Sequence, residues 1–249
     1  MDHPGGPPNG GTILGYVYGT IGLALIGWLA WFGMRRRRYG GQGPLEGVLS
    51  AHIYLGLALI VVATLHTGFR FHWNVHTLAF ALMAIVIVSG IFGAFAFWRY
   101  PALMTHNRAG ATLGSMAAEM AALDQQCRDL ALGFSDEIEA MVVAVTRDDG
   151  GKFTLREILL GRGPNPLKGV TGTAINRLRD EVGGAGKTLP AEVLPLVQAL
   201  TKRATLVAKL RRDRRYRALL LLWRAIHVPV TVALVIALVI HVFAVLYYR

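Results

Sequence analysis

Cysteine and acidic residues are both scarce in this chain. Of its 249 residues one is a cysteine, Cys127, which excludes a disulfide within the chain. It also excludes a cysteine-ligated iron–sulfur cluster and a CxxCH c-type haem site in this chain. The 15 acidic residues stand against 26 Lys and Arg, giving a formal net charge of +11. Together with long apolar segments, such a charge is more typical of the cytoplasmic faces of a membrane protein than of a nucleic-acid-binding protein.

Two further sequence signals are missing. The first ten residues contain no Lys or Arg, so no cleavable signal peptide is expected. No GxGxxG dinucleotide fingerprint is present, which argues against a built-in flavin or nicotinamide reductase. The string GGAGKT at 183–188 ends like a phosphate-binding loop, but Glu181 stands where that motif requires its first glycine. A helix rather than a strand is expected before it, so no nucleotide site is predicted there.

Long apolar segments are abundant, and hydrophobic residues make up 53% of the chain. Four segments are long enough to span a bilayer as helices: 12–33, 48–69, 75–98 and 218–247. The sequence therefore predicts an all-α integral membrane protein with a four-helix bundle. Its expected domains are a disordered Gly/Pro-rich tail (1–11), transmembrane helices 1–3 (12–100), a mostly helical cytoplasmic insert (101–217) and transmembrane helix 4 (218–249).

Basic residues predict the orientation of the four segments. Arg35–Arg38 follow the first segment, and the basic run 202–217 precedes the fourth. Both runs are expected on the cytoplasmic side of the membrane, with the N- and C-termini on the outer side. The second and fourth segments then run parallel to each other. The run 202–217 lacks interleaved aromatics apart from Tyr216, so we expect contact with anionic lipid or a protein partner rather than nucleic acid.

Two histidine pairs share one spacing. His52 and His66 lie in the second segment, His227 and His241 in the fourth, and 14 residues separate each pair. Fourteen residues of α-helix turn about 1400° and rise about 21 Å, so both members of a pair face one side of the helix. On parallel helices His52 lies level with His227, and His66 with His241. Zinc requires three or four converging ligands, whereas haem iron takes one axial histidine from each side of its ring. The spacing favours two b-type haems; helix–helix hydrogen bonding is the alternative for an isolated histidine.

Neighbouring residues suit the same cofactor. Gly19 and Gly33 of the first segment repeat the 14-residue interval and could leave room for a porphyrin. Gly90 and Gly93 of the third segment could do the same. The alternative is ordinary close packing of helices, which also uses small residues. The cationic candidates for the haem propionates are Arg70, four residues after His66, and Arg224, three before His227. At the outer end, His72 and His76 are candidates for a quinone or proton site.

The two His-x13-His pairs, with glycines on the other helices, resemble the di-haem core of the cytochrome b superfamily. The strings LHTGFRFHWNVH and WRAIHVPVTVAL also resemble bacterial respiratory cytochrome b subunits. The resemblance covers the four segments and implies that His52, His66, His227 and His241 ligate two haem b groups. It further implies electron transfer between quinone and partner redox subunits, periplasmic or cytoplasmic. Whether the chain is itself an enzyme is left open by the sequence.

The insert 101–217 has no counterpart in such a core. We expect helices at 108–132, 134–146 and 171–183, and a helix from about 190 that continues into the fourth segment. Two other functions remain open. One is a ferric-reductase-like haem protein, which normally carries a flavin domain. The other is a membrane anchor or assembly subunit without redox activity.

Overall fold

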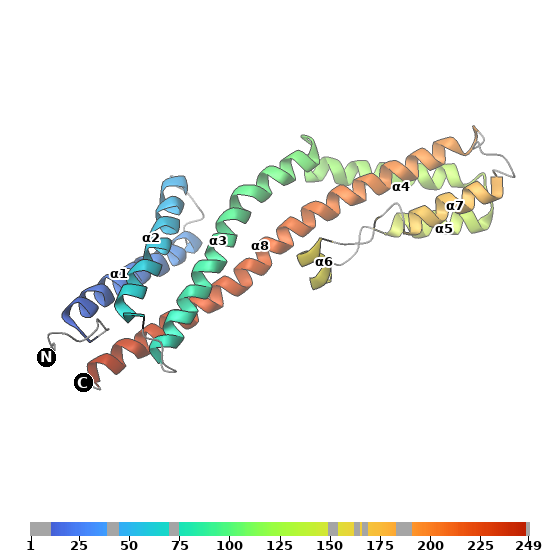
Figure 1. The fold of residues 1–249 in the computed structure, drawn as a ribbon. Helices are drawn as coiled ribbons and strands as arrows, with labels where there is room; N and C mark the ends of the chain where they lie inside the picture. Colours follow the sequence, from blue (N-terminus) through green and yellow to red (C-terminus); the bar gives the residue numbers. More distant parts are fainter. Residues whose placement is uncertain are drawn as a thin grey trace. The chain divides into compact units, whose positions relative to one another are not determined.

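The computed structural model describes residues 11–38, 45–69, 75–148, 154–161, 165, 169–182 and 191–247. Every regular element in these ranges is an α-helix, which confirms the all-α prediction (Figure 1). The helices are α1 (Ile13–Arg38), α2 (Leu45–Thr67), α3 (Val75–Arg108), α4 (Leu113–Ala131), α5 (Asp136–Arg147), α6 (Leu155–Leu160), α7 (Val170–Val182) and α8 (Leu194–Tyr247). The predicted tail and the GGAGKT string lie almost wholly outside the described residues.

The chain divides into two compact units. We call Met1–Phe97 with Leu222–Arg249 the histidine unit, and Trp98–Leu221 the insert unit. Both boundaries fall inside helices, one in α3 and one in α8. The sequence placed the limits of the insert at 101 and 217. The helix expected from about 190 into the fourth segment is confirmed, because α8 is continuous from Leu194 to Tyr247.

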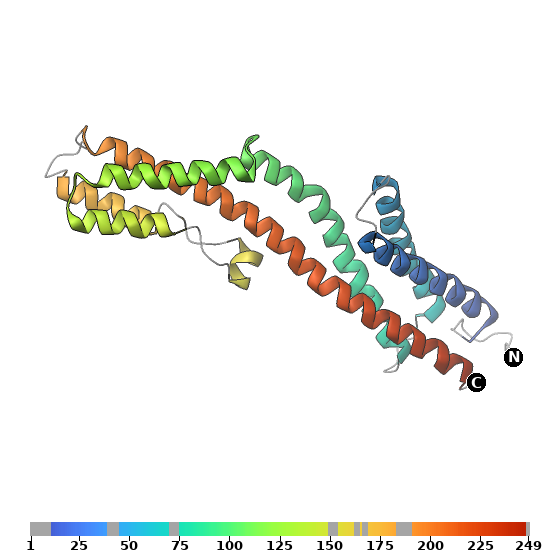
Figure 2. The same ribbon diagram turned by 180° about the vertical axis from the view of Figure 1, so that it is seen from behind.

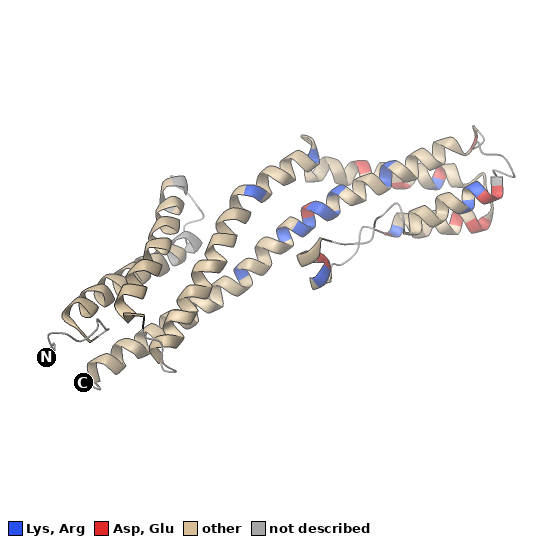
Figure 3. Cartoon of the chain, in the orientation of Figure 1, with Lys and Arg blue, Asp and Glu red and all other residues tan. Residues whose placement is uncertain are grey.

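The histidine unit contains α1, α2, the first part of α3 and the last part of α8. These four helices are long and apolar enough to cross a membrane. Their hydrophobic contacts meet at Leu59, Met83, Ile87 and Leu234, with side chains of α1 packed against this cluster. Many other large apolar side chains of the unit face outward. Among its described side chains, Arg224 is the one Lys, Arg, Asp or Glu, and Figure 3 shows such residues concentrated in the insert unit.

Helix α3 is longer than its apolar segment. It continues to Arg108, ten residues beyond the predicted end at 98, and includes Pro101. The residues after Pro101 are largely good helix formers, so the helix resumes beyond the proline. It ends where Ala109 and Gly110 adopt left-handed conformations, with φ of 51° and 87°. Arg108 pairs with the buried carboxylate of Asp213 on α8, which fixes this end of α3 within the insert unit.

The insert unit is built around a helical core. Helices α4, α5, α7 and the N-terminal part of α8 lie side by side in both ribbon views (Figures 1 and 2). The core contains Cys127 of α4, Val142 of α5, Leu178 of α7 and Leu200 of α8. The helices predicted at 108–132, 134–146 and 171–183 correspond to α4, α5 and α7, with shifted ends. Helix α6 is an additional element that the sequence did not predict.

A buried arginine joins three parts of the insert unit. Arg203 of α8 is 2% exposed. Its Nε donates to Oδ1 of Asp124 on α4 at 2.5 Å, and its Nη2 donates to the carbonyls of Thr146 at 2.8 Å and Asp148 at 3.1 Å. Desolvating a guanidinium is costly unless its donors are satisfied. The carboxylate and the two carbonyls meet this requirement and fix the end of α5 against α8.

Candidate functional site

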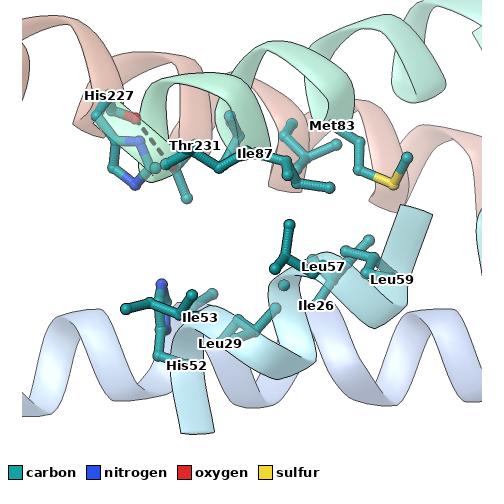
Figure 4. A pocket seen from close by; sticks show the side chains of 16 residues that line it. Ile26, Leu29, His52, Ile53, Leu57, Leu59, Met83, Ile87, His227 and Thr231 are labelled. Atoms are coloured by element: carbon teal, nitrogen blue, oxygen red, sulfur yellow. Dashed lines mark hydrogen bonds between the residues drawn. The ribbon is translucent and has the colours of Figure 1, made fainter. Parts of the chain in front are cut away.

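His52 of α2 and His227 of α8 point towards each other across a cavity of the histidine unit (Figure 4). Helices α1 and α2 form one wall, and α3 and α8 form the other. The cavity itself has a volume of about 100 Å³, and a value of about 690 Å³ is reached only when adjoining open solvent is counted. Its lining is apolar except for the two rings and Thr231. A Cβ built on Gly56 of this lining would meet no atom within 4 Å. The result is an apolar space with an imidazole on each wall.

His227 is fixed by α3 and by its own helix. Its Nδ1 lies 2.7 Å from Oγ of Ser89, and its backbone carbonyl accepts from Oγ1 of Thr231 at 2.7 Å. The indole of Trp223 lies beside the imidazole, with ring centroids 5.3 Å apart. A Cβ built on Gly93 would overlap that indole. The small residue that the sequence assigned to a porphyrin wall therefore makes room for Trp223 in this structure.

His52 has a different environment. Its Nδ1 is buried and has no hydrogen-bond partner among the described residues. The ring of Phe32 on α1 is its aromatic neighbour, at a centroid distance of 5.5 Å. An unsatisfied buried polar atom costs about 1–3 kcal/mol, so a native structure that keeps one calls for an explanation. Iron ligation through Nε2 would leave this Nδ1 without a partner, so the fit of His52 to an axial haem ligand rests on its place on an apolar wall opposite a second imidazole.

His66 of α2 is oriented by α1. Its Nδ1–H donates to the carbonyl of Gly15 at 2.7 Å. In the neutral ring this leaves the lone pair on Nε2, the arrangement common to histidines that ligate a metal. A Cβ on Gly19 would lie 2.8 Å from Cε1 and 3.1 Å from Nδ1 of His66. Gly19 therefore leaves room for the ligand candidate itself, although the sequence had assigned it to a porphyrin wall.

His241 of α8 contacts two other histidines. Its ring centroid lies 6.0 Å from that of His66, with the planes at 80°. Its Nδ1 lies 2.6 Å from Nδ1 of His76, which is exposed near the start of α3. One of these two nitrogens must carry the hydrogen and the other must accept it. The structure thus brings His66 to His241, and His52 to His227 across the cavity, which are the pairs that the sequence placed level.

The remaining predicted site residues are Arg70, Arg224 and Gly33. Arg70 lies outside the described residues. Arg224 is exposed on α8. Gly33 is exposed on α1, and a Cβ built there would meet no atom within 4 Å. Gly33 therefore contacts neither histidine pair in this structure, and its predicted role, like those of the two arginines, stays a prediction.

Sequence reasoning missed the residues that orient the histidines. Ser89, Trp223 and the backbone carbonyl of Gly15 were not singled out. The available signal for Ser89 was a hydroxyl in an apolar segment next to Gly90. Its meaning depends on the side chain of His227, which is 138 residues away in the chain.

Comparison of the chain with protein-family models, curated proteins and solved structures gave no match. Within the described ranges, no three His, Cys, Asp or Glu side chains converge as ligands of one metal ion. A zinc site with three or four protein ligands therefore has no counterpart there. The chemistry of the site has to be argued from the paired imidazoles and their surroundings.

Proposed function

We propose that this protein is an integral membrane di-haem cytochrome b that carries electrons across a bacterial inner membrane. One observation carries the proposal: His52 and His227 face each other across an apolar cavity whose walls come from four long apolar helices. Two imidazoles from opposite sides are the ligand set of a b-type haem. The second pair, His66 and His241, supports a second haem 14 residues further along both helices, a rise of about 21 Å.

The membrane location is supported by the outer surface of the histidine unit. Apolar side chains such as Val61, Val88 and Phe243 are more than half exposed. Such a surface is unfavourable in water and suits lipid. By the positive-inside rule, the basic runs 35–38 and 202–217 favour a cytoplasmic location for these two runs and for the ends of the helices next to them. In this orientation the pair His52–His227 is the inner one, and His66–His241 is the outer one.

The protein contributes placement and electrostatics at both sites. Haem supplies reversible one-electron chemistry when it is bound. His52 and His227 would hold the inner haem, and His66 and His241 the outer haem. Arg70 and Arg224 remain the candidate partners of the propionates. The apolar walls would limit the access of water and so influence the redox potential.

Electron partners must come from outside the chain. Because Cys127 is the sole cysteine, this chain cannot hold a cysteine-ligated iron–sulfur cluster. Its sequence also contains no dinucleotide fingerprint. We therefore propose that quinone or partner redox subunits exchange electrons with the two haems, and that the protein is one subunit of a respiratory oxidoreductase. The insert unit would then offer a surface for a cytoplasmic partner.

The test is the haem content of the purified full-length chain. We expect a b-type absorption spectrum and about two haems per chain by the pyridine haemochrome method. His52→Ala and His241→Ala should each remove one haem. His106→Ala is the matched control, because His106 is exposed in the insert unit and should not affect either haem.

Three outcomes separate the alternatives. Two haems with the expected losses support the cytochrome b. A folded but colourless protein overturns it and favours the membrane anchor, in which the histidines only pack helices together. Haem-loaded protein that transfers electrons from an added flavin reductase to ferric chelates, but not to or from quinones, favours the ferric-reductase-like function.

A further inference from the structure

Ser89 lies at the centre of a hydrogen-bonded group beside the cavity. Its Oγ donates to the carbonyl of Val86 at 2.9 Å and lies 2.7 Å from Nδ1 of His227. Its own carbonyl accepts from Nε1 of Trp223 at 2.7 Å. The absence of a Cβ at Gly93 leaves the indole close enough to α3 to make this bond. Ser89 is therefore fixed through both its side chain and its backbone.

The single hydroxyl hydrogen determines the direction of the bond to His227. The carbonyl of Val86 can only accept, so both contacts of Oγ are hydrogen bonds in one arrangement alone: the hydroxyl donates to Val86, and Oγ accepts from the imidazole. Nδ1 of His227 must then carry a hydrogen, and in the neutral ring the lone pair lies on Nε2. If the hydroxyl donated to Nδ1 instead, Nε2 would carry the hydrogen and could not bind a metal.

We propose that Ser89 is the positioning residue of the inner haem site: it fixes the tautomer and orientation of His227 and leaves Nε2 free to ligate iron. This inference rests on the function proposed above and adds a residue to it. It also distinguishes the two inner ligands, since Nδ1 of His52 has no hydrogen-bond partner among the described residues. His227 is thus the ligand of this pair whose tautomer is set by the protein.

Removing the hydroxyl has a defined expected effect. Hydrogen bonds of this kind raise the basicity of a ligating histidine, and their loss typically lowers metal affinity about 10- to 100-fold. A more basic ligand favours ferric over ferrous iron, so Ser89→Ala should also raise the midpoint potential of the inner haem. A tenfold loss of affinity confined to the ferric form corresponds to about 59 mV.

The experiment uses the full chain with a His241→Ala background, which leaves the inner haem alone if the proposed function is correct. Haem affinity is measured by titrating the apo-protein with haemin, and the potential by redox titration of the α-band. Ser89→Ala is compared with Ser89→Thr, which keeps a hydroxyl. Thr64→Ala is the control, since Oγ1 of Thr64 bonds to the carbonyl of Ile60 on its own helix.

The inference is supported if Ser89→Ala weakens haem binding and raises the potential while Ser89→Thr restores both. It is overturned if the inner haem of Ser89→Ala keeps its affinity and potential. It is equally overturned if Ser89→Ala and Ser89→Thr lose the haem to the same extent, because side-chain shape rather than the hydroxyl would then matter. A parent protein without haem contradicts the proposed function instead, so the two failures are distinguishable.

Discussion

Substituting Gly19 tests whether His66 depends on the space beside α1. A Cβ at this position would lie 2.8 Å from Cε1 and 3.1 Å from Nδ1 of His66. Real Cβ atoms essentially never approach a side chain as closely as the first of these distances. In Gly19→Ala the imidazole must therefore turn or shift, and its bond to the carbonyl of Gly15, now 2.7 Å long, is strained or lost.

The size of the effect follows from two costs. Overpacking by one methyl group typically costs about 1–3 kcal/mol, and a hydrogen bond of this kind contributes about 0.5–1.5 kcal/mol. If a total of about 2 kcal/mol falls on the orientation of His66, haem affinity at the outer site decreases roughly 30-fold, since about 1.4 kcal/mol corresponds to a factor of ten. The proposed inner site of His52 and His227 should keep its haem.

The assay is the haem content and α-band spectrum of Gly19→Ala equilibrated with free haem at a few times the dissociation constant of the parent chain's outer site. Gly27→Ala is the matched control on the same helix, because a Cβ there would meet no atom within 4 Å. We expect Gly19→Ala to retain about one haem per chain and Gly27→Ala to retain about two. If both variants bind haem like the parent chain, the role given to the space at Gly19 is refuted.

Two further predictions concern the insert unit. Arg203→Ala leaves Asp124 and two backbone carbonyls without their donor, which should destabilise the fold by about 3–5 kcal/mol and lower the thermal midpoint followed by circular dichroism. Arg177→Ala is the control, because it removes only an exposed ion pair and should unfold like the parent chain. Equal midpoints for the two variants would contradict this account. Cys127 is fully buried, so the folded chain should resist labelling by a polar maleimide and should bind one equivalent of it after denaturation. Complete labelling of the folded chain would show that the core around α4 is open.

Much of the helical architecture follows from local sequence patterns. The four apolar segments follow from the length of their hydrophobic runs. The amphipathic helix α5 follows from periodicity, because its core positions Ile138, Val142 and Val145 recur every three or four residues. Helix α6 could not be predicted in this way, since six residues are too few for a period. Its position depends on the capping box of Thr154 and Glu157 and on Nε of Arg215, which donates to the carbonyl of Ile158 from 57 residues away.

Only part of the candidate site could likewise be predicted from the sequence. The pairing of His52 with His227 could be predicted because spacing on a helix fixes a face and charge asymmetry gives a direction. The residues that orient the rings could not, because a serine in an apolar segment has no signature of its own. The role of Ser89 arises only when Val86 and His227 both lie within reach of its hydroxyl.

The most direct test of the central claim is the haem content of two double variants. If His52 and His227 ligate one haem, His52→Ala/His227→Ala loses that haem alone and retains about one per chain. His52→Ala/His241→Ala removes a ligand from each pair and should retain none. A colourless first variant together with a haem-containing second variant would contradict the level pairing and, with it, the di-haem arrangement across the membrane.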